Sequence, residues 1–311
     1  MPTLNQLIPN IPLTNISVQF KNPGYLADQI APTIPVVYES APYYTYDYSR
    51  FDVPDAKRAP TADYARVEYK VDKSSTYTCE EYGLEQLIDD RQRKNTPAPL
   101  DADVDTTEIV TDMLLNNVEN AVSTPLTALA TYAATNKKDY SALPAAQWNA
   151  GATSTPLEDV TITGREAIRS LTGLYPNTLI LGATVLAVLR QHPQIKEMVK
   201  YSQLGIVTEE LLAKFFGVER VLVGLSMRNT AKEGQTVTLG DNWGKHAVLA
   251  YVNPRPAIKQ PSLMYTFQSQ PRKVYKYRED KKNSDCIRVS QILDPRIVAA
   301  ACGYLFYSVV A

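Results

Sequence analysis

The sequence DADVDTTEIVTDMLLNNVENAVSTP, residues 101–125, has a helical hydrophobic period, and the rest of the chain is arranged around it. The start of this stretch is acidic, with Asp103, Asp105 and Glu108. Acidic groups at this position stabilise a helix because they lie at the positive end of its dipole. Apolar residues then recur at helical spacing, at Ile109, Val110, Met113, Leu114, Val118, Ala121 and Val122. We predict a long amphipathic helix, kinked or restarted at 123–125 because proline clashes inside a helix.

Residues 1–37 precede this helix and are rich in both proline and apolar side chains. Prolines at positions 2, 9, 12, 23, 32 and 35 block a continuous helix and remove strand donors, which favours an extended arm. Such an arm has no core of its own, so it must bury its apolar residues on another domain or another chain. We expect it to serve assembly through Leu4, Leu7, Ile8, Ile11, Leu13, Ile16, Val18, Phe20, Leu26, Ile30, Ile34 and Val36.

Residues 38–80 carry two aromatic runs on either side of a polar stretch. Their partly alternating pattern predicts a long β-hairpin. A two-stranded ribbon is only marginally stable in water, so we expect this one to lie on a neighbouring subunit. The pattern comprises Tyr38, Tyr43, Tyr44, Tyr46, Tyr48, Phe51, Tyr64, Val67, Tyr69, Val71 and Tyr77.

Downstream of the helix, residues 136–154 have the composition of a polar linker rich in alanine and glycine. A capping-box pattern at 155–158 then opens a new domain, in which helices alternate with strands. We predict helices ending at Leu171, Arg190 and Phe216, with strands at 178–181 and 220–223. From Ala247 the pattern turns to strands at 247–252, 263–268, 274–278, 286–292 and 303–310. Pairing of the last strand with the hairpin region would interleave the domains.

The overall composition excludes several classes of protein. The formal net charge is −1 over 311 residues, so the overall charge gives no indication of a nucleic-acid or membrane partner. Cys79, Cys286 and Cys302 are scattered without CxxC spacing, which argues against disulfides and structural zinc. The sequence shows neither a signal peptide nor an apolar run of about 18 residues. We expect a soluble, reduced protein that assembles in the cytoplasm.

Catalytic and cofactor motifs are missing from the sequence. It has two histidines, His192 and His246, and we interpret His192 as a surface cap residue. The stretch 240–246 has the wrong glycine spacing for a phosphate loop and lacks Ser or Thr after Lys245. The acidic group at 101–105 lacks the glycine and glutamate of a calcium loop. We therefore predict no catalytic, cofactor-binding or metal-binding residues.

Basic residues gather late in the chain, within 272–288. Such a run suits a solvated strand face by default, but it could also pair with phosphates or with acidic groups of a neighbouring subunit. We retain four of these residues as candidate charge contacts, Arg272, Lys273, Lys276 and Arg278.

Several short stretches, in this order, cover most of the chain: LADQIAP (26–32), DDRQRKN (89–95), TGLYPNTLILG (172–182), QHP (191–193), IK (195–196), KY (200–201), LLAKFFGV (211–218) and DNWG (241–244). With the sequence of arm, ribbon, long helix, α/β domain and returning strands, the chain resembles the tailed-phage major capsid proteins of the Hong Kong 97 type. The resemblance implies an α+β fold with an N-arm (1–37), an E-loop (38–85), a P domain with a spine helix (86–150), an A domain (151–285) and returning strands (286–311).

By the same resemblance, the chain builds an icosahedral shell of hexamers and pentamers around double-stranded DNA in the virion, and is not an enzyme. Family members often begin with a long charged segment; this chain does not, so we expect a separate scaffolding protein, with portal and decoration proteins as further partners. The hypothesised inter-subunit residues are Leu7, Ile11, Phe20, Tyr43, Tyr46, Tyr48, Phe51, Tyr64 and Tyr69. Alternatives are an encapsulin-type shell around a cargo enzyme, another virion component such as a tail tube, and a hydrolase with an unrecognised site.

Overall fold

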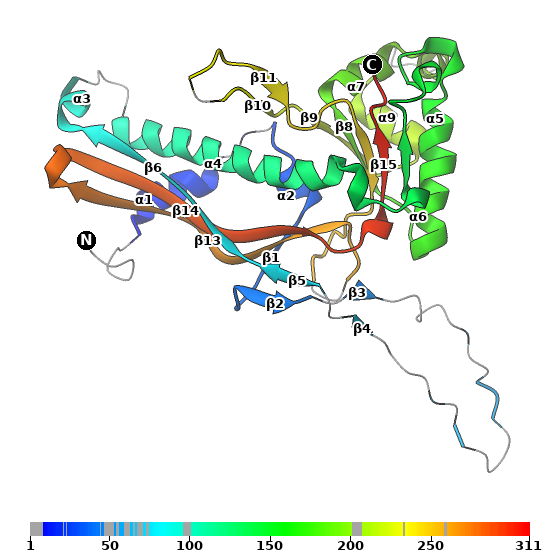
Figure 1. Ribbon diagram of the computed structural model, residues 1–311, viewed down its shortest axis with the longest axis horizontal. Helices are drawn as coiled ribbons and strands as arrows, with labels where there is room; N and C mark the ends of the chain where they lie inside the picture. Colours follow the sequence, from blue (N-terminus) through cyan, green and yellow to red (C-terminus); the bar gives the residue numbers. More distant parts are fainter. Residues whose placement is uncertain are drawn as a thin grey trace.

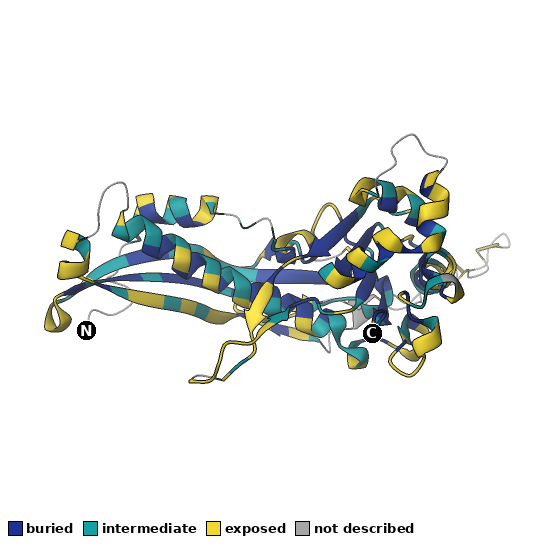
Figure 2. Cartoon of the chain, turned by 90° about the horizontal axis from the view of Figure 1, so that it is seen from above, coloured by how far each residue is buried: buried dark blue, intermediate teal, exposed yellow. Residues whose placement is uncertain are grey.

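A computed structural model shows an elongated molecule built around two β-sheets (Figure 1). The structure describes residues 9–311 except for 21, 23, 44, 47–52, 54–55, 59–62, 65, 67–70, 73–74, 96–100, 201–206, 233 and 258–259. One end of the molecule is a long four-stranded sheet with a long helix, and the other is a five-stranded sheet surrounded by helices. Buried residues follow the strands of both sheets (Figure 2). The predicted α+β class is confirmed.

The four-stranded sheet has the order β1-β13-β14-β6, and consists of β1 (Thr33–Pro35), β13 (Met264–Glu279), β14 (Ser284–Ile297) and β6 (Glu80–Asp89). β13 and β14 form a long antiparallel hairpin, and β6 pairs with the other side of β14. The strands predicted at 263–268 and 274–278 are the single strand β13. Its register shifts between Gln268 and Lys273, where Pro271 cannot donate a ladder hydrogen bond.

The predicted long helix is α4 (Ala102–Thr127), which lies along this sheet. The side chain of its N-cap residue, Asp101, accepts a hydrogen bond from the Asp103 N–H at 2.9 Å. Val110 and Leu114 belong to one core cluster with strand residues of β13 and β14. The predicted restart at 123–125 is wrong, because α4 continues through Pro125, and the predicted kink there stays a prediction. The proline falls in the last turn, so its disruption is confined to the helix end.

The five-stranded sheet has the order β7-β15-β12-β8-β9, and consists of β7 (Lys137–Asp139), β15 (Gly303–Tyr307), β12 (Ala247–Ala250), β8 (Thr178–Gly182) and β9 (Arg220–Gly224). Every residue of β8 and β12 is buried, as expected for central strands that are covered on both faces. The chain end pairs with β12 and β7, not with the hairpin region. The two ends of the chain still share both sheets, but through other pairs than predicted. The late strand β14 pairs with the early strand β6, and the last strand β15 pairs with β7.

Helices cover this second sheet, namely α5 (Pro156–Glu158), α6 (Arg165–Thr172), α7 (Ala183–Gln191), α8 (Pro193–Lys200) and α9 (Glu209–Phe216). The predicted ends at Leu171 and Phe216 agree with those of α6 and α9 to within one residue. Each helix is followed by a glycine in the left-handed conformation, Gly173 with φ 71° and Gly217 with φ 65°. The Thr208 hydroxyl caps α9 by accepting from the Leu211 N–H at 3.3 Å.

The segment 136–154 is not a linker, which corrects the prediction. Its aromatic residues Tyr140 and Trp148 are fully buried in the core of the five-stranded sheet. Both bind Asp159: the Tyr140 hydroxyl donates at 2.5 Å and the Trp148 indole donates at 3.2 Å. The two sheets do not follow the expected A-domain bounds of 151–285. Residues 137–150, which precede that range, pack with the five-stranded sheet, whereas β13, which lies within it, belongs to the four-stranded sheet.

The arm is partly folded onto its own chain, contrary to the expectation that it has no intramolecular core. It contains α1 (Ile11–Gln19), α2 (Ala27–Ile30) and β1. Leu26 and Ile30 are buried in a cluster that includes Val118 and Val122 of α4. The arm therefore contributes to the stability of a single subunit.

The base of the predicted hairpin is present. β2 (Ser40–Pro42) pairs with β5 (Thr76–Thr78), and β3 (Thr45–Tyr46) pairs with β4 (Val71–Asp72), both antiparallel. Most of the ribbon between Tyr46 and Val71 lies outside the described residues.

Gly224 gives a direct test of this packing. A Cβ at this position would lie 2.0 Å from Cδ1 of the buried Trp243. We predict that Gly224→Ala lowers the free energy of unfolding, measured by urea denaturation of the free subunit, by about 2–3 kcal/mol. The control is Gly240→Ala in β11 (Leu239–Asp241), where the added methyl meets only a Thr230 methyl, at 3.1 Å. Equal effects of the two variants would contradict the packing argument.

Candidate functional site

A fully buried carboxylate, Glu119, lies where the arm, α4 and the five-stranded sheet meet. Its Oε2 accepts hydrogen bonds from the backbone N–H groups of Leu26 at 2.9 Å and Ala27 at 2.7 Å. Its Oε1 accepts from the Trp243 indole at 2.6 Å and from the Ser226 hydroxyl at 3.3 Å. One side chain thus joins three segments that are distant in sequence. We refer to this set of contacts as the Glu119 junction.

All four hydrogen-bond donors to the Glu119 carboxylate are uncharged groups. Burial raises the pKa of Glu119, and the hydrogen bonds from Trp243, Ala27, Leu26 and Ser226 act in the opposite direction without cancelling it. A buried carboxylate without these donors would be strongly unfavourable. The junction therefore depends on all of its donors being correctly placed.

Glycines bring Trp243 into position. β9 ends at Gly224 against the indole ring, and a Cβ on Gly182 would lie only 1.9 Å from the carbonyl oxygen of Gly244. Gly244 itself adopts a left-handed backbone, with φ 57°. The DNWG stretch, 241–244, is thus a turn that buries an aromatic residue, Trp243. Its partner Glu119 was missed, because a glutamate in an amphipathic helix carries no signal that it is buried.

Further polar contacts fasten the arm to α4. The carboxylate Oδ1 of Asp112 accepts from the Asn22 amide at 3.1 Å and from the Tyr25 hydroxyl at 3.0 Å. Burial and the nearby Asp112 raise the pKa of Tyr25, so its hydroxyl stays protonated. Two buried hydroxyls, of Ser17 and Thr111, lie 2.8 Å apart and share a hydrogen bond.

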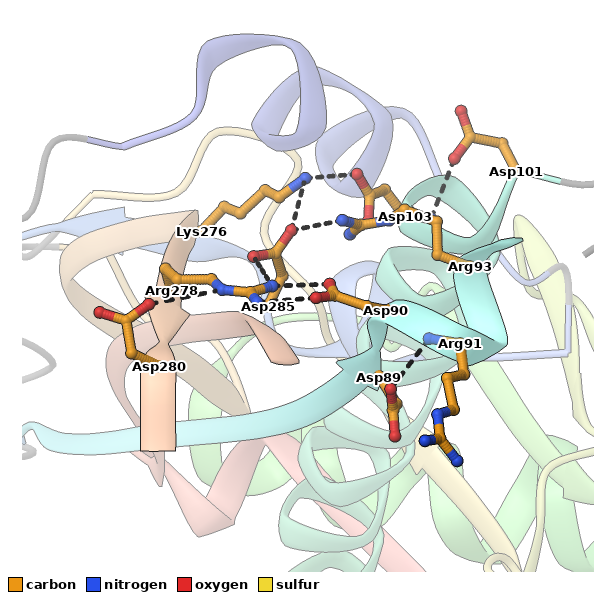
Figure 3. Close-up of polar contacts among 10 residues, drawn as sticks. All are labelled: Asp89, Asp90, Arg91, Arg93, Asp101, Asp103, Lys276, Arg278, Asp280 and Asp285. Carbon is orange, nitrogen blue, oxygen red and sulfur yellow. Dashed lines mark hydrogen bonds and ion pairs between the residues drawn. The ribbon is translucent and has the colours of Figure 1, made fainter. Parts of the chain in front are cut away.

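A network of charged residues occupies the far end of the long sheet, where β6, β13 and β14 meet α3 (Asp90–Asn95) and the start of α4 (Figure 3). Arg278 binds Asp90 through two hydrogen bonds of 2.7 Å each. Arg93 bridges Asp103 and Asp285, and Lys276 also reaches both carboxylates. Burial favours a higher pKa for Asp285, but the hydrogen bonds from Arg93 and Arg278 outweigh it and lower the pKa.

Two of the four candidate charge contacts have partners within their own chain. Lys276 and Arg278 were candidates for contacts with phosphates or a neighbouring subunit, yet both pair with acidic groups of their own chain. Arg272 lies apart, at a cavity beside the arm, and Lys273 is half-buried on β13. The network thus ties α3 and α4 to the sheet.

The hypothesised inter-subunit residues lie in different environments. Ile11 is 70% exposed on α1 and Tyr64 is 76% exposed, so both are available for contact. Phe20 is half-buried. Tyr43 is buried on its own chain, stacked on Phe267 with its hydroxyl donating to the Ile297 carbonyl at 3.2 Å. Tyr46 pairs through its backbone in β3. The remaining candidates lie outside the described residues: Leu7, Tyr48, Phe51 and Tyr69.

Neither histidine is arranged for catalysis. His192 is buried, not on the surface as predicted, and its Nε2 lies 2.9 Å from the Ser154 hydroxyl. His246 accepts a hydrogen bond from the Ser308 N–H at 3.0 Å and stacks on Tyr307. Burial lowers the pKa of both imidazoles. Both side chains therefore support loops around the five-stranded sheet.

The described part of the chain offers neither a metal site nor a membrane-spanning helix. No group of three or more His, Cys, Asp or Glu side chains there is placed to hold a metal ion. Within the same residues, no helix has both the length and the apolar character that a bilayer crossing requires.

Comparison with known proteins identifies the family. No family model matches the chain. The chain is 30% identical over 298 residues to the major capsid protein of Burkholderia phage BcepMu, covering 94% of each protein. The chain belongs to the phage major capsid protein family. The capsid protein is also 29% identical over 242 residues to the major capsid protein of Pseudomonas phage JBD67, covering 77% of this chain and 75% of that protein.

Solved structures confirm the capsid fold. A phage-related protein from Bordetella bronchiseptica RB50 matches with a TM-score of 0.79 at 24% identity, over 97% of this capsid protein and 98% of that chain. The capsid of cyanophage P-SCSP1u matches with a TM-score of 0.60 at 11% identity, over 99% and 92%. An encapsulin complex from Synechococcus elongatus PCC 7942 matches with 0.51 at 10% identity, over 100% and 91%. The encapsulin shares the fold, whereas sequence identity places the chain with the phage proteins.

The Glu119 junction predicts a large effect of one substitution. Glu119→Ala leaves two backbone N–H groups, a hydroxyl and an indole N–H buried without an acceptor. We expect the free energy of unfolding of the free subunit to fall by about 3–5 kcal/mol in urea denaturation. Glu119→Gln keeps one acceptor oxygen and should lose less. Asn117→Ala, at an exposed position of the same helix, should change stability by less than about 0.5 kcal/mol. A similar result for Glu119→Ala would contradict the junction.

The charged network predicts a pH dependence. The pKa of Asp285 is lowered in the folded protein, so its stabilisation is present above the ordinary aspartate pKa of about 3.9 and is lost as pH falls through the lowered value. We expect Asp285→Asn to lower the free energy of unfolding by about 1–3 kcal/mol at neutral pH, with the difference from wild type disappearing below that pKa. Asp280→Asn is the control, since its side chain is 93% exposed. A difference that persists unchanged in acid would rule out this role for Asp285.

Proposed function

We propose that this capsid protein is the major head subunit of a tailed phage, which self-assembles into hexamers and pentamers of an icosahedral shell around double-stranded DNA. The observation that carries this proposal is the 30% identity to a phage major capsid protein over 94% of both chains. The fold supports it, since the TM-score to a cyanophage capsid is 0.60 over almost the whole chain. The virion is its proposed location, with assembly in the host cytoplasm.

The surface of the subunit supports a structural role. α1 packs Leu13 inward while Ile11 on the same helix is 70% exposed, so one helix serves both the subunit core and an available contact surface. The two buried histidines have structural partners and a lowered pKa, which supports our proposal that the protein is not an enzyme.

The proposed partners follow from the same features. The net charge of −1 and the internal pairing of Lys276 and Arg278 favour enclosure of DNA by non-specific proximity over tight binding. We further propose a separate scaffolding protein, a portal and decoration proteins as the remaining partners. Lys276 and Arg278 pair with acidic groups of their own subunit, and they stay candidates for charge contacts between subunits together with Arg272 and Lys273.

Electron microscopy of the purified capsid protein, with and without a co-expressed scaffolding protein, tests the function. We expect closed shells. Open tubes would indicate a tail component, and small shells filled with a cargo enzyme would indicate an encapsulin.

Two variants of α1 separate assembly from folding. Ile11→Asp changes an exposed residue, so the thermal midpoint of the free subunit should stay within about 2 °C while the yield of shells falls. Leu13→Asp buries a charge and should instead lower the midpoint of the subunit itself. Normal shells from Ile11→Asp would exclude this residue from the interface.

A further inference from the structure

A cavity of about 290 Å³ lies between the arm, α4 and β13. One part of its wall is apolar and includes Val18, Phe20, Leu115 and Val118. The other part carries charge, from Asp28 of α2 and Arg272 of β13. None of the contacts described above fills this cavity.

Arg272 is a half-buried cation, and two of its guanidinium nitrogens are shielded from solvent. These atoms, Nε and Nη1, are buried and donate no hydrogen bond. Asp28 attracts Arg272 electrostatically, but no ion pair joins Arg272 to any described carboxylate. Burying guanidinium N–H groups without an acceptor is unfavourable, so these two nitrogens lower the stability of the isolated subunit.

The nearby carboxylates on α4 are already engaged. Asp112 accepts hydrogen bonds from Asn22 and Tyr25, and Glu119 accepts from the four donors of the Glu119 junction. Asp28 is exposed on the four-residue helix α2. Among the described residues, Asp28 is the carboxylate that lines the cavity, and it forms no ion pair with Arg272.

We propose that this cavity binds an acidic side chain of a second copy of the chain, whose carboxylate pairs with Arg272 while its aliphatic stem packs on Val18, Phe20 and Leu115. This inference rests on the proposed function, because shell assembly is what brings a second copy to the cavity. It adds an inter-subunit ion pair that forms only in the assembled state.

Charge and shape favour a single protein carboxylate over a phosphate. One guanidinium matches one carboxylate, with which it can form two parallel hydrogen bonds. Asp28 on the same wall repels a doubly charged phosphate more strongly than a singly charged carboxylate, and the apolar wall matches the stem of a glutamate or aspartate better than a hydrated ion.

The exposed apolar residues of α1 support a second copy as the source. Ile11 is 70% exposed and Val18 is 51% exposed, and their spacing of seven places them on one side of the helix. Val18 lines the cavity, so this stripe leads from the outer surface of α1 to the cavity mouth. A partner that covers the stripe would carry an acidic side chain to Arg272.

Two substitutions test the proposal with opposite expected signs. Arg272→Met removes the unpaired charge, so the thermal midpoint of the free subunit should stay equal to or rise above that of wild type. Shells of the same variant lack the inter-subunit pair, and the subunit concentration needed for assembly should rise about tenfold or more. Arg272→Lys keeps the charge but not the planar guanidinium. The subunit concentration that it needs for assembly should lie between those of wild type and Arg272→Met. Lys281→Met removes an exposed charge from the turn between β13 and β14, away from the cavity, and should leave assembly unchanged.

Cryo-electron microscopy of wild-type shells locates the occupant directly. A carboxylate of another copy against the Arg272 guanidinium is the expected result. Normal shells with no such carboxylate, or Arg272→Met shells that assemble like wild type, would overturn the cavity assignment alone. A failure of wild type to form shells under any condition would overturn the proposed function, and the second-copy occupant with it.

Inorganic phosphate tests whether the cavity binds a free anion instead of a carboxylate of a second copy. If phosphate raises the thermal midpoint of the free wild-type subunit and not that of Arg272→Met, the cavity is a site for a free anion and the second-copy assignment is wrong. We expect phosphate to have the same small effect on both proteins.

Discussion

The buried carboxylate of Glu119 is the interaction on which the arrangement of this capsid protein depends. It accepts from the backbone of the arm, from the Ser226 hydroxyl and from the Trp243 indole, all inside the molecule. None of these donors is charged, so the carboxylate is stable only while the arm, α4 and the five-stranded sheet keep their mutual positions. The junction therefore makes three separate segments fold as one unit, at the point where the two sheets meet.

The arm and the charged network extend the same principle along the molecule. The arm buries Ile30 and Leu26 on α4, while α1 keeps Ile11 exposed, so a single subunit is stable and still presents apolar surface. At the far end, acidic residues of α3, α4 and β14 form ion pairs with Lys276 and Arg278 of β13. A shell subunit must resist deformation along its length, and these contacts fix both ends of the long sheet.

Local signals located most of the fold. The spacing of Val110, Leu114 and Val118 identified α4, and the predicted helix ends at Leu171 and Phe216 agree with α6 and α9 to within one residue. Local sequence patterns did not predict which segments are buried by contacts with distant parts of the chain. The composition of 136–154 suggested a linker, but Trp148 and Tyr140 are buried because Asp159, further along the chain, supplies acceptors for both. The arm lacks a local core in sequence, yet finds one on α4.

The sequence by itself determined the α+β class, the order of elements and the resemblance to phage capsid proteins, because periodicity, caps and turns are properties of neighbouring residues. Only the tertiary structure decided which charges are internal: it pairs Lys276 and Arg278 with their own chain, buries Glu119 among neutral donors and leaves Arg272 unpaired beside a cavity. The physical reason is that burial and partnership of a polar group depend on residues distant in the chain, which folding alone brings within hydrogen-bond distance.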